Sequence, residues 1–208
     1  MERRRCHAVC AFRSRLRGMP LTSTLIYLVG ASGSGKDSLL AHARARLATQ
    51  QEVIFAHRYI TRAASAGGEN HIALSTAEFA MRQQAGLLAM HWESHGYYYG
   101  VGIEINHWLA KGMTVVVNGS REYLPTATEM YPELRSVWIE VDPETLRVRL
   151  EARGRENPDE ISARLARRTP RQPSDHSGDV IRNDGALNVA GDALVDLIRR
   201  HSGIPLCA

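Results

Sequence analysis

The sequence predicts an α/β fold in which a parallel β-sheet core is flanked by helices, and three observations lead to this class. From residue 25 onward, short apolar runs alternate with amphipathic segments, the pattern of repeated strand and helix units. A glycine-rich loop at residues 30–36 joins the first apolar run to the first amphipathic segment. The 208 residues, of which 44% are hydrophobic and 23% charged, suffice for one well-buried globular domain.

The individual elements follow in chain order from these patterns. A buried strand is expected at 25–29, and a helix at 37–48, where apolar residues recur on one face. Asp142 and Pro143 begin a further helix as its N-cap and first helical residue. The other strands are expected at 52–57, 114–117, 136–141 and 180–181, and the other helices at 76–84, 159–168 and 187–200.

Residues 58–100 interrupt the alternation of strands and helices. Small and polar residues precede the short helix in this segment, and residues rich in His, Trp and Tyr follow it. We interpret the segment as an insertion between the second and third core strands, where a flap that binds an acceptor would lie. Residues 21–208 are expected to form a single domain, with a lid at about 149–170 and a loop at 169–178.

The positive charge of the chain is concentrated in its first residues. The chain carries +4 and residues 1–18 carry +5, so the other 190 residues carry −1. Arginines at 13, 15 and 17 interrupt any apolar run long enough for a secretory signal. We favour a disordered basic extension at 1–20 or a translation start at Met19. A transit peptide and a basic arm that contacts nucleic acid are the alternatives, and no nucleic-acid partner is expected for the folded part.

Cysteine usage and hydropathy bear on the compartment. Cys6, Cys10 and Cys207 lie at the extremes of the chain and do not complete a zinc site or a disulfide framework. No apolar run approaches the ~20 residues of a membrane span. We therefore expect a cytoplasmic protein without a membrane partner. The sequence does not decide the oligomeric state, and a homodimer is compatible with it.

The loop at residues 30–36 is the most specific motif in the chain. It has the spacing G-x4-G-K between a strand and a helix, the context of a loop that binds nucleotide phosphates. Its glycines allow successive N–H groups to face phosphate oxygens, and the following helix adds the positive end of its dipole. Lys36 is expected to reach the β- and γ-phosphates. The predicted ATP-binding residues are Gly30, Ala31, Ser32, Gly33, Ser34, Gly35, Lys36, Asp37 and Ser38.

One position departs from this motif. Asp37 stands where Ser or Thr normally offers a hydroxyl to Mg²⁺. Either Asp37 is a direct Mg²⁺ ligand, or it complements the positive helix start while Ser38 or water serves the metal. The strand at 114–117 is followed by Asn118, so no second acid stands at that position.

Arginines are the remaining candidates, because phosphoryl transfer requires neutralisation of charge more than covalent chemistry. Arg58 and Arg62 stand at the start of the insertion. Arg149 and Arg153 are four residues apart and therefore share one helical face, and Arg164 lies on the next expected helix. Together with Lys36, we predict Arg62, Arg149, Arg153 and Arg164 as catalytic residues of a phosphotransferase.

From about residue 25 to 198 the chain resembles the guanylate kinase group of nucleoside monophosphate kinases. Residues 30–36, 61–62, 96–100, 149–154, 164–165 and 183–184 carry the resemblance, together with Phe79. It implies that Arg62 and Tyr98 hold the acceptor phosphate, that Arg149, Arg153 and Arg164 belong to the lid, and that Asn183 lies near the adenine. Met90 stands where that group has the Glu that reads guanine, and Met cannot accept guanine's hydrogen bonds.

A closer resemblance is to ribose 1,5-bisphosphate phosphokinases, and it rests on residues 33–38, 57–62, 69–75, 98–102 and 117–121. It implies Mg²⁺- and ATP-dependent formation of 5-phosphoribosyl 1-diphosphate in phosphonate breakdown. The nucleophile would be an anionic phosphate oxygen, which needs no general base. The residues implied for the phosphorylated sugar are Arg58, Arg62, Tyr98, Asn118 and Arg121. The rival interpretations are a guanylate or other nucleoside monophosphate kinase, a non-catalytic module and a nucleic-acid binder.

Overall fold

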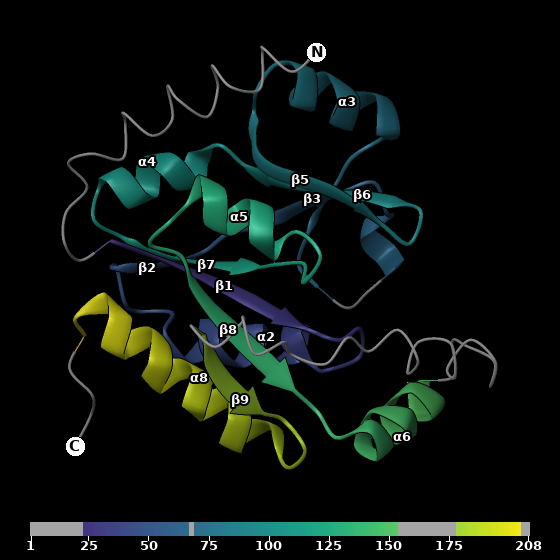
Figure 1. Ribbon diagram of the computed structural model, residues 1–208, viewed down its shortest axis with the longest axis vertical. Helices are drawn as coiled ribbons and strands as arrows, with labels where there is room; N and C mark the ends of the chain where they lie inside the picture. Colours follow the sequence, from purple (N-terminus) through teal and green to yellow (C-terminus); the bar gives the residue numbers. More distant parts are fainter. Residues whose placement is uncertain (1–22, 67–68, 154–177, 205–208) are drawn as a thin grey trace.

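The computed structural model describes residues 23–66, 69–153 and 178–204, and two β-sheets organise them (Figure 1). The larger sheet has five strands in the order β2–β7–β1–β8–β9, and all neighbouring pairs are parallel. Its strands are β1 (Thr24–Gly30), β2 (Val53–Phe55), β7 (Thr114–Asn118), β8 (Arg135–Glu140) and β9 (Asp179–Arg182). The expected α/β fold with a parallel sheet is confirmed. Because β1 is central, segments distant in the sequence meet beside the loop that follows it.

Helices cover both faces of the larger sheet (Figure 1). One face carries α2 (Lys36–Arg46) and α8 (Leu187–Ser202), and the other carries α4 (Glu104–Ala110) and α5 (Leu124–Met130). The side chains of β1 alternate between the two cores. Ile26 and Leu28 pack with α2 and α8, whereas Leu25, Tyr27 and Val29 pack on the other side. Burial of both faces explains why the strand is a continuous apolar run.

Residues 58–102, which include the expected insertion, form a separate four-stranded sheet in the order β4–β3–β6–β5. Its elements are β3 (Arg58–Ile60), η1 (Ala64–Ala66), β4 (Ile72–Ala73), α3 (Thr76–Gln84), β5 (Leu88–Ser94) and β6 (Tyr97–Gly102). His95 and Gly96 join β5 to β6 with positive φ angles of 51° and 75°, as a two-residue type I′ hairpin turn requires. Met90 and Val101 pack into the core beneath α4 and α5, which fixes the smaller sheet against the larger one.

Side-chain caps begin two of the helices, and the cap expected at Asp142 is confirmed. The Ser75 hydroxyl accepts a hydrogen bond from the Glu78 N–H at 3.1 Å, so α3 begins where the sequence predicts. The Asp142 carboxylate accepts one from the Glu144 N–H at 2.9 Å and caps α6 (Pro143–Arg153). The expected extension at 1–20, the helix at 159–168 and nearly all of the loop at 169–178 lie outside the described residues.

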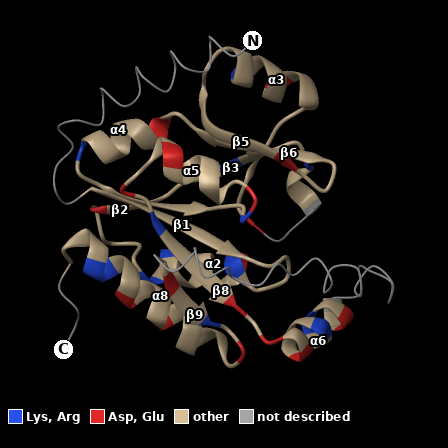
Figure 2. Ribbon diagram, in the orientation of Figure 1, with Lys and Arg blue, Asp and Glu red and all other residues tan. Residues whose placement is uncertain are grey.

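The sequence predicts β2 too long and does not predict α4 or α5. β2 ends at Phe55 because the chain turns there toward β3 and the smaller sheet. Acidic and basic residues are interspersed along α6, whereas the basic residues of α8 lie in its last turn, at Arg199 and Arg200 (Figure 2). Within the described part of the chain, no helix combines the length and apolar character needed to cross a membrane.

Candidate active site

The phosphate loop, residues 30–36, follows the carboxyl end of the central strand β1 and opens α2. It lines a cavity of about 730 Å³, and residues of the smaller sheet line the same cavity. This is the edge of a parallel sheet at which α/β proteins bind ligands. The expected site residues that line it are residues 30–38 apart from Ser34, with Arg58, Arg62, Arg121, Arg149 and Asn183.

Close packing on two sides shapes the phosphate loop. Gly33 and Gly35 have φ angles of 87° and 85°, which side-chain-bearing residues rarely adopt. A Cβ atom at Gly35 would lie 2.5 Å from Asn183 Nδ2, and one at Gly33 would lie 2.9 Å from a methyl carbon of Leu150 on α6. The loop therefore requires glycine both for its backbone angles and for the space its neighbours occupy.

Asn183, just after β9, binds the phosphate loop through its side-chain amide. Its side-chain Nδ2 donates a hydrogen bond of 2.8 Å to the Ser34 carbonyl, and both residues are buried. Its own backbone N–H donates to the Glu140 carbonyl at the end of β8. The resemblance places Asn183 near the adenine, and in the structure its side-chain N–H is engaged with the phosphate loop, whose shape it helps to set.

The side chain of Lys36 contacts the main chain of the phosphate loop. Its Nζ donates hydrogen bonds of 2.9 Å to the Gly30 carbonyl and 3.1 Å to the Ala31 carbonyl. Burial lowers the pKa of the Lys36 ammonium to about 8, because desolvation penalises its charged form. A phosphate brought beside this group would favour the charged form again.

The Asp37 carboxylate lies beside the buried side-chain amide of Asn118. Asn118 Nδ2, at the end of β7, donates a hydrogen bond of 2.8 Å to Asp37 Oδ1. Asn118 Oδ1 is buried without a hydrogen-bond partner among the described residues. Carboxylate and amide oxygens are ligands of Mg²⁺ and accept hydrogen bonds from its bound waters, so the chemistry of these residues fits the ion. The described residues hold no group of three or more His, Cys, Asp or Glu suited to a metal.

Asn118 is buried, lies outside the described cavity lining and donates its side-chain hydrogen bond to Asp37. The sequence predicts this residue among the sugar contacts, whereas its side chain at the end of β7 is directed toward the start of α2. In this arrangement Asn118 orients the Asp37 carboxylate, and a contact with the sugar stays a prediction.

Arg58 and Glu69 form a buried ion pair in the cavity wall. Arg58 Nε donates to Glu69 Oε1 at 2.7 Å, and Arg58 Nη2 donates to Glu69 Oε2. Their side chains are 12% and 10% exposed. The Arg58 guanidinium lies over the Tyr99 ring, 5.0 Å from its centroid. Because Glu69 neutralises Arg58, the charge of this arginine is already paired within the cavity wall. No local pattern in the sequence predicts this pairing.

Arg62 is better placed than Arg58 to bind an anion. It lines the cavity, and its Nε is buried with no hydrogen-bond partner among the described residues. The ring of His71 lies against the main chain around it, with Nε2 3.1 Å from the Arg62 carbonyl and Nδ1 3.2 Å from the Glu69 carbonyl. The ring of His71 lies between these two carbonyls, and the single N–H of a neutral imidazole donates to one of them. Arg58, Arg62 and Glu69 form the side of the cavity that we call the acceptor wall.

The tyrosines of β6 alternate between the cavity and the packing against Phe79 of α3, and the predicted phosphate contact of Tyr98 stays a prediction. Tyr98 stacks on Phe79, with ring centroids 5.6 Å apart, and lies outside the cavity lining. Its neighbours Tyr97 and Tyr99 line the cavity, because successive strand residues point to opposite faces. Met90 of β5 is fully buried in the core, and Trp92, two residues further, lines the cavity instead. The alternation of side chains along β6 directs Tyr97 and Tyr99 to the cavity, but the sequence does not mark this segment as a strand.

The expected lid arginines are only partly described. Arg149 of α6 lines the cavity, and its Nη1 is buried without a partner in the described structure. Arg153 ends α6, but its side chain lies outside the described residues, as does the whole of Arg164. Arg121 lines the cavity from the segment between β7 and α5. The cavity thus brings together Lys36 and four of the predicted arginines.

Known proteins resemble the chain in sequence and in structure. The chain is 54% identical over 174 residues to a protein of Thiobacillus denitrificans named "Ribose 1,5-bisphosphate phosphokinase PhnN", covering 84% of this chain and 92% of that protein. It is 55% identical over 178 residues to the protein of the same name from Desulfomicrobium baculatum, covering 85% and 94%. The solved guanylate kinase of Anaplasma phagocytophilum superimposes with a TM-score of 0.63 at 18% identity, covering 86% of each chain. No protein-family model matches the chain.

The buried ammonium of Lys36 predicts a pH dependence of folding stability. Between about pH 8 and 10.5 the unfolded chain retains a proton at Lys36 that the folded chain has lost. The contribution of Lys36 to the free energy of unfolding should therefore rise with pH across this window. Urea unfolding of wild type and Lys36→Met at several pH values measures it. We expect the wild type to gain stability relative to the variant as pH rises, and a constant difference would contradict the burial of the charge.

Proposed function

The chain belongs to the ribose 1,5-bisphosphate phosphokinase family, and from this premise we propose that it transfers the γ-phosphoryl group of ATP to the 1-phosphate of ribose 1,5-bisphosphate. The products are ADP and 5-phosphoribosyl 1-diphosphate. One observation supports the proposal more than any other. A single cavity contains a phosphate loop with its lysine and also Arg62 and Arg121 from outside that loop. Such a site suits a reaction between two phosphorylated molecules.

The phosphate loop would hold the triphosphate through its N–H groups, the start of α2 and Lys36. The carbonyls of Gly30 and Ala31 already orient the Lys36 ammonium. Asp37, oriented by Asn118, would hold Mg²⁺ directly or through water. When bound, the ion neutralises charge on the transferring phosphoryl group and the leaving diphosphate.

The acceptor needs positioning more than activation. An oxygen of the 1-phosphate is already anionic at neutral pH, so it attacks the γ-phosphorus without a general base. A P–O bond to this oxygen forms as the bond between the γ-phosphorus and the bridging oxygen of ATP breaks, and ADP carries away the electron pair. Arg62 and Arg121 would hold the acceptor's phosphates, and Arg149 would neutralise the transferring group. We extend the same role to Arg153 and Arg164 on the resemblance alone.

The wider setting is proposed on the same basis. We place the reaction in phosphonate breakdown and in the cytoplasm, with ATP and a phosphorylated sugar as the molecules bound. Nucleic acid and membrane are not among the proposed partners.

Acceptor profiling tests the proposed activity. With Mg²⁺ and ATP, kcat/KM for ribose 1,5-bisphosphate should exceed that for GMP and AMP by at least about 100-fold, or about 2.7 kcal/mol of transition-state stabilisation. Lys36→Ala should lower kcat by at least about 100-fold while circular dichroism shows an intact fold. The matched control is Lys111→Ala at an exposed residue after α4, which should leave activity unchanged. Efficient use of GMP by the wild type would overturn the assignment.

Titration with Mg²⁺ tests the role of Asp37. If Asp37 ligates the ion, Asp37→Asn should raise the Mg²⁺ concentration for half-maximal activity about tenfold, and Asp37→Ser should recover much of the loss by restoring a hydroxyl ligand. Unchanged titration curves, with a loss of about 0.3–1 kcal/mol in the free energy of unfolding, would show that Asp37 serves only the helix start.

A further inference from the structure

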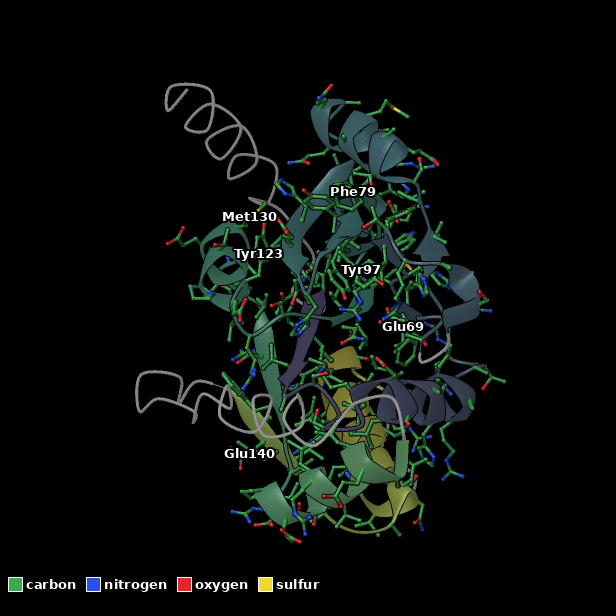
Figure 3. The ribbon with its side chains drawn as sticks, turned by 90° about the vertical axis from the view of Figure 1, so that its right-hand side faces the viewer. Glu69, Phe79, Tyr97, Tyr123, Met130 and Glu140 are labelled. Carbon is green, nitrogen blue, oxygen red and sulfur yellow. The ribbon has the colours of Figure 1, made fainter. Side chains whose placement is uncertain are left out.

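We propose that Glu69 determines sugar specificity by accepting hydrogen bonds from the hydroxyl groups of the acceptor's ribose. The inference deepens the proposed function and rests on it, because it assigns the part of the acceptor that lies between the two phosphates. Glu69 belongs to the segment between η1 and β4, and its side chain lines the cavity. In Figure 3, Glu69 and Tyr97 lie on the side of the molecule that faces the viewer, between α3 and α6.

Cationic side chains outnumber acidic ones in the cavity lining, so a carboxylate there calls for an explanation from the substrate that it would contact. Among the described residues, the lining contains five cationic side chains and three acidic ones. The acids are Asp37, Glu69 and Glu122. Asp37 is the candidate metal ligand, whereas Glu69 lies on the acceptor wall beside Arg58 and Arg62. A carboxylate ~4 Å from a phosphate is repelled by about 1 kcal/mol in water and about 4 kcal/mol near a protein surface. Glu69 therefore suits the uncharged part of the acceptor, which consists of the sugar ring and its hydroxyls.

The hydrogen bonds of Glu69 leave the right capacity for a diol. An ionised carboxylate offers about four lone-pair positions on its two oxygens. Arg58 occupies one position on each oxygen, through Nε and Nη2. About one position therefore remains on each oxygen, which matches two neighbouring hydroxyl donors such as the 2- and 3-hydroxyls of ribose.

The carboxylate is also held rigidly, as a specific reader of hydroxyls must be. Arg58 fixes the side chain at two points, and the ring of Tyr99 lies under the Arg58 guanidinium. His71 lies 3.2 Å from the Glu69 carbonyl and holds its main chain. With a side chain only 10% exposed, Glu69 loses little further freedom when a hydroxyl binds. In this arrangement Arg58 is a positioning residue for Glu69.

A cycle of two acceptors and two proteins tests the proposal. The acceptors are ribose 1,5-bisphosphate and 2-deoxyribose 1,5-bisphosphate, and the proteins are wild type and Glu69→Gln, which keeps the side-chain shape. The wild type should favour the hydroxylated acceptor in kcat/KM by at least about tenfold, because loss of the hydroxyl leaves a buried acceptor unpaired. In Glu69→Gln this preference should fall by about tenfold, with the loss concentrated on the hydroxylated acceptor.

Controls separate this role from a structural one. Glu93→Gln, at an exposed glutamate of β5 outside the cavity lining, should preserve both activity and preference. If Glu69→Gln does not fold, the double variant Arg58→Gln and Glu69→Gln removes both charges together, and its preference should be reduced in the same way. An equal loss on both acceptors would show that Glu69 only pairs with Arg58, and would overturn the inference while the proposed function stands. A wild type inactive on ribose 1,5-bisphosphate would overturn both.

Discussion

The hydrogen bond from Asn183 to the Ser34 carbonyl joins two residues that are far apart in the sequence, and the geometry of the active site depends on it. The phosphate loop is stabilised only in part by its own contacts, through Lys36 and the turn from Ser34 to Ala31. From outside, Asn183 supports the loop at Ser34 and Gly35, and Leu150 packs against Gly33. Leaving the buried Ser34 carbonyl unpaired would cost about 1–3 kcal/mol, enough to favour another loop conformation.

The loop in turn positions the charged groups of the site. It sets the start of α2, and so the places of Lys36 and Asp37, while β7 brings Asn118 beside the carboxylate. The region of the smaller sheet supplies the acceptor wall, where Glu69 neutralises Arg58. In the part of the chain that the structure describes, the buried Nε donor of Arg62 has no partner. The charges are therefore divided by function. Cations without an acidic partner suit phosphates, and the paired carboxylate suits a neutral part of the acceptor.

Local patterns in the sequence predicted the larger sheet, the phosphate loop and α3 well, because glycine spacing, capping residues and apolar periodicity act over a few neighbouring residues. The hairpin of β5 and β6 does not follow from the sequence pattern, since three consecutive tyrosines hide its alternation. The pattern therefore does not separate Tyr98 from Tyr97 and Tyr99, which line the cavity. The roles of Asn118 and Asn183 depend on partners 81 and 149 residues away. A single sequence holds no local signal for such contacts.

The most direct test of this account is the equilibrium affinity of the protein for ATP, measured by calorimetry on wild type and Asn183→Ala. The control is Asn106→Ala, which removes the acceptor of the 2.7 Å hydrogen bond from the Tyr131 hydroxyl and lies outside the cavity lining. We expect Asn183→Ala to raise the Kd for ATP at least about tenfold, or about 1.4 kcal/mol, while Asn106→Ala leaves it unchanged. A folded Asn183→Ala protein with the wild-type Kd would contradict the claim that Asn183 holds the phosphate loop in its binding shape.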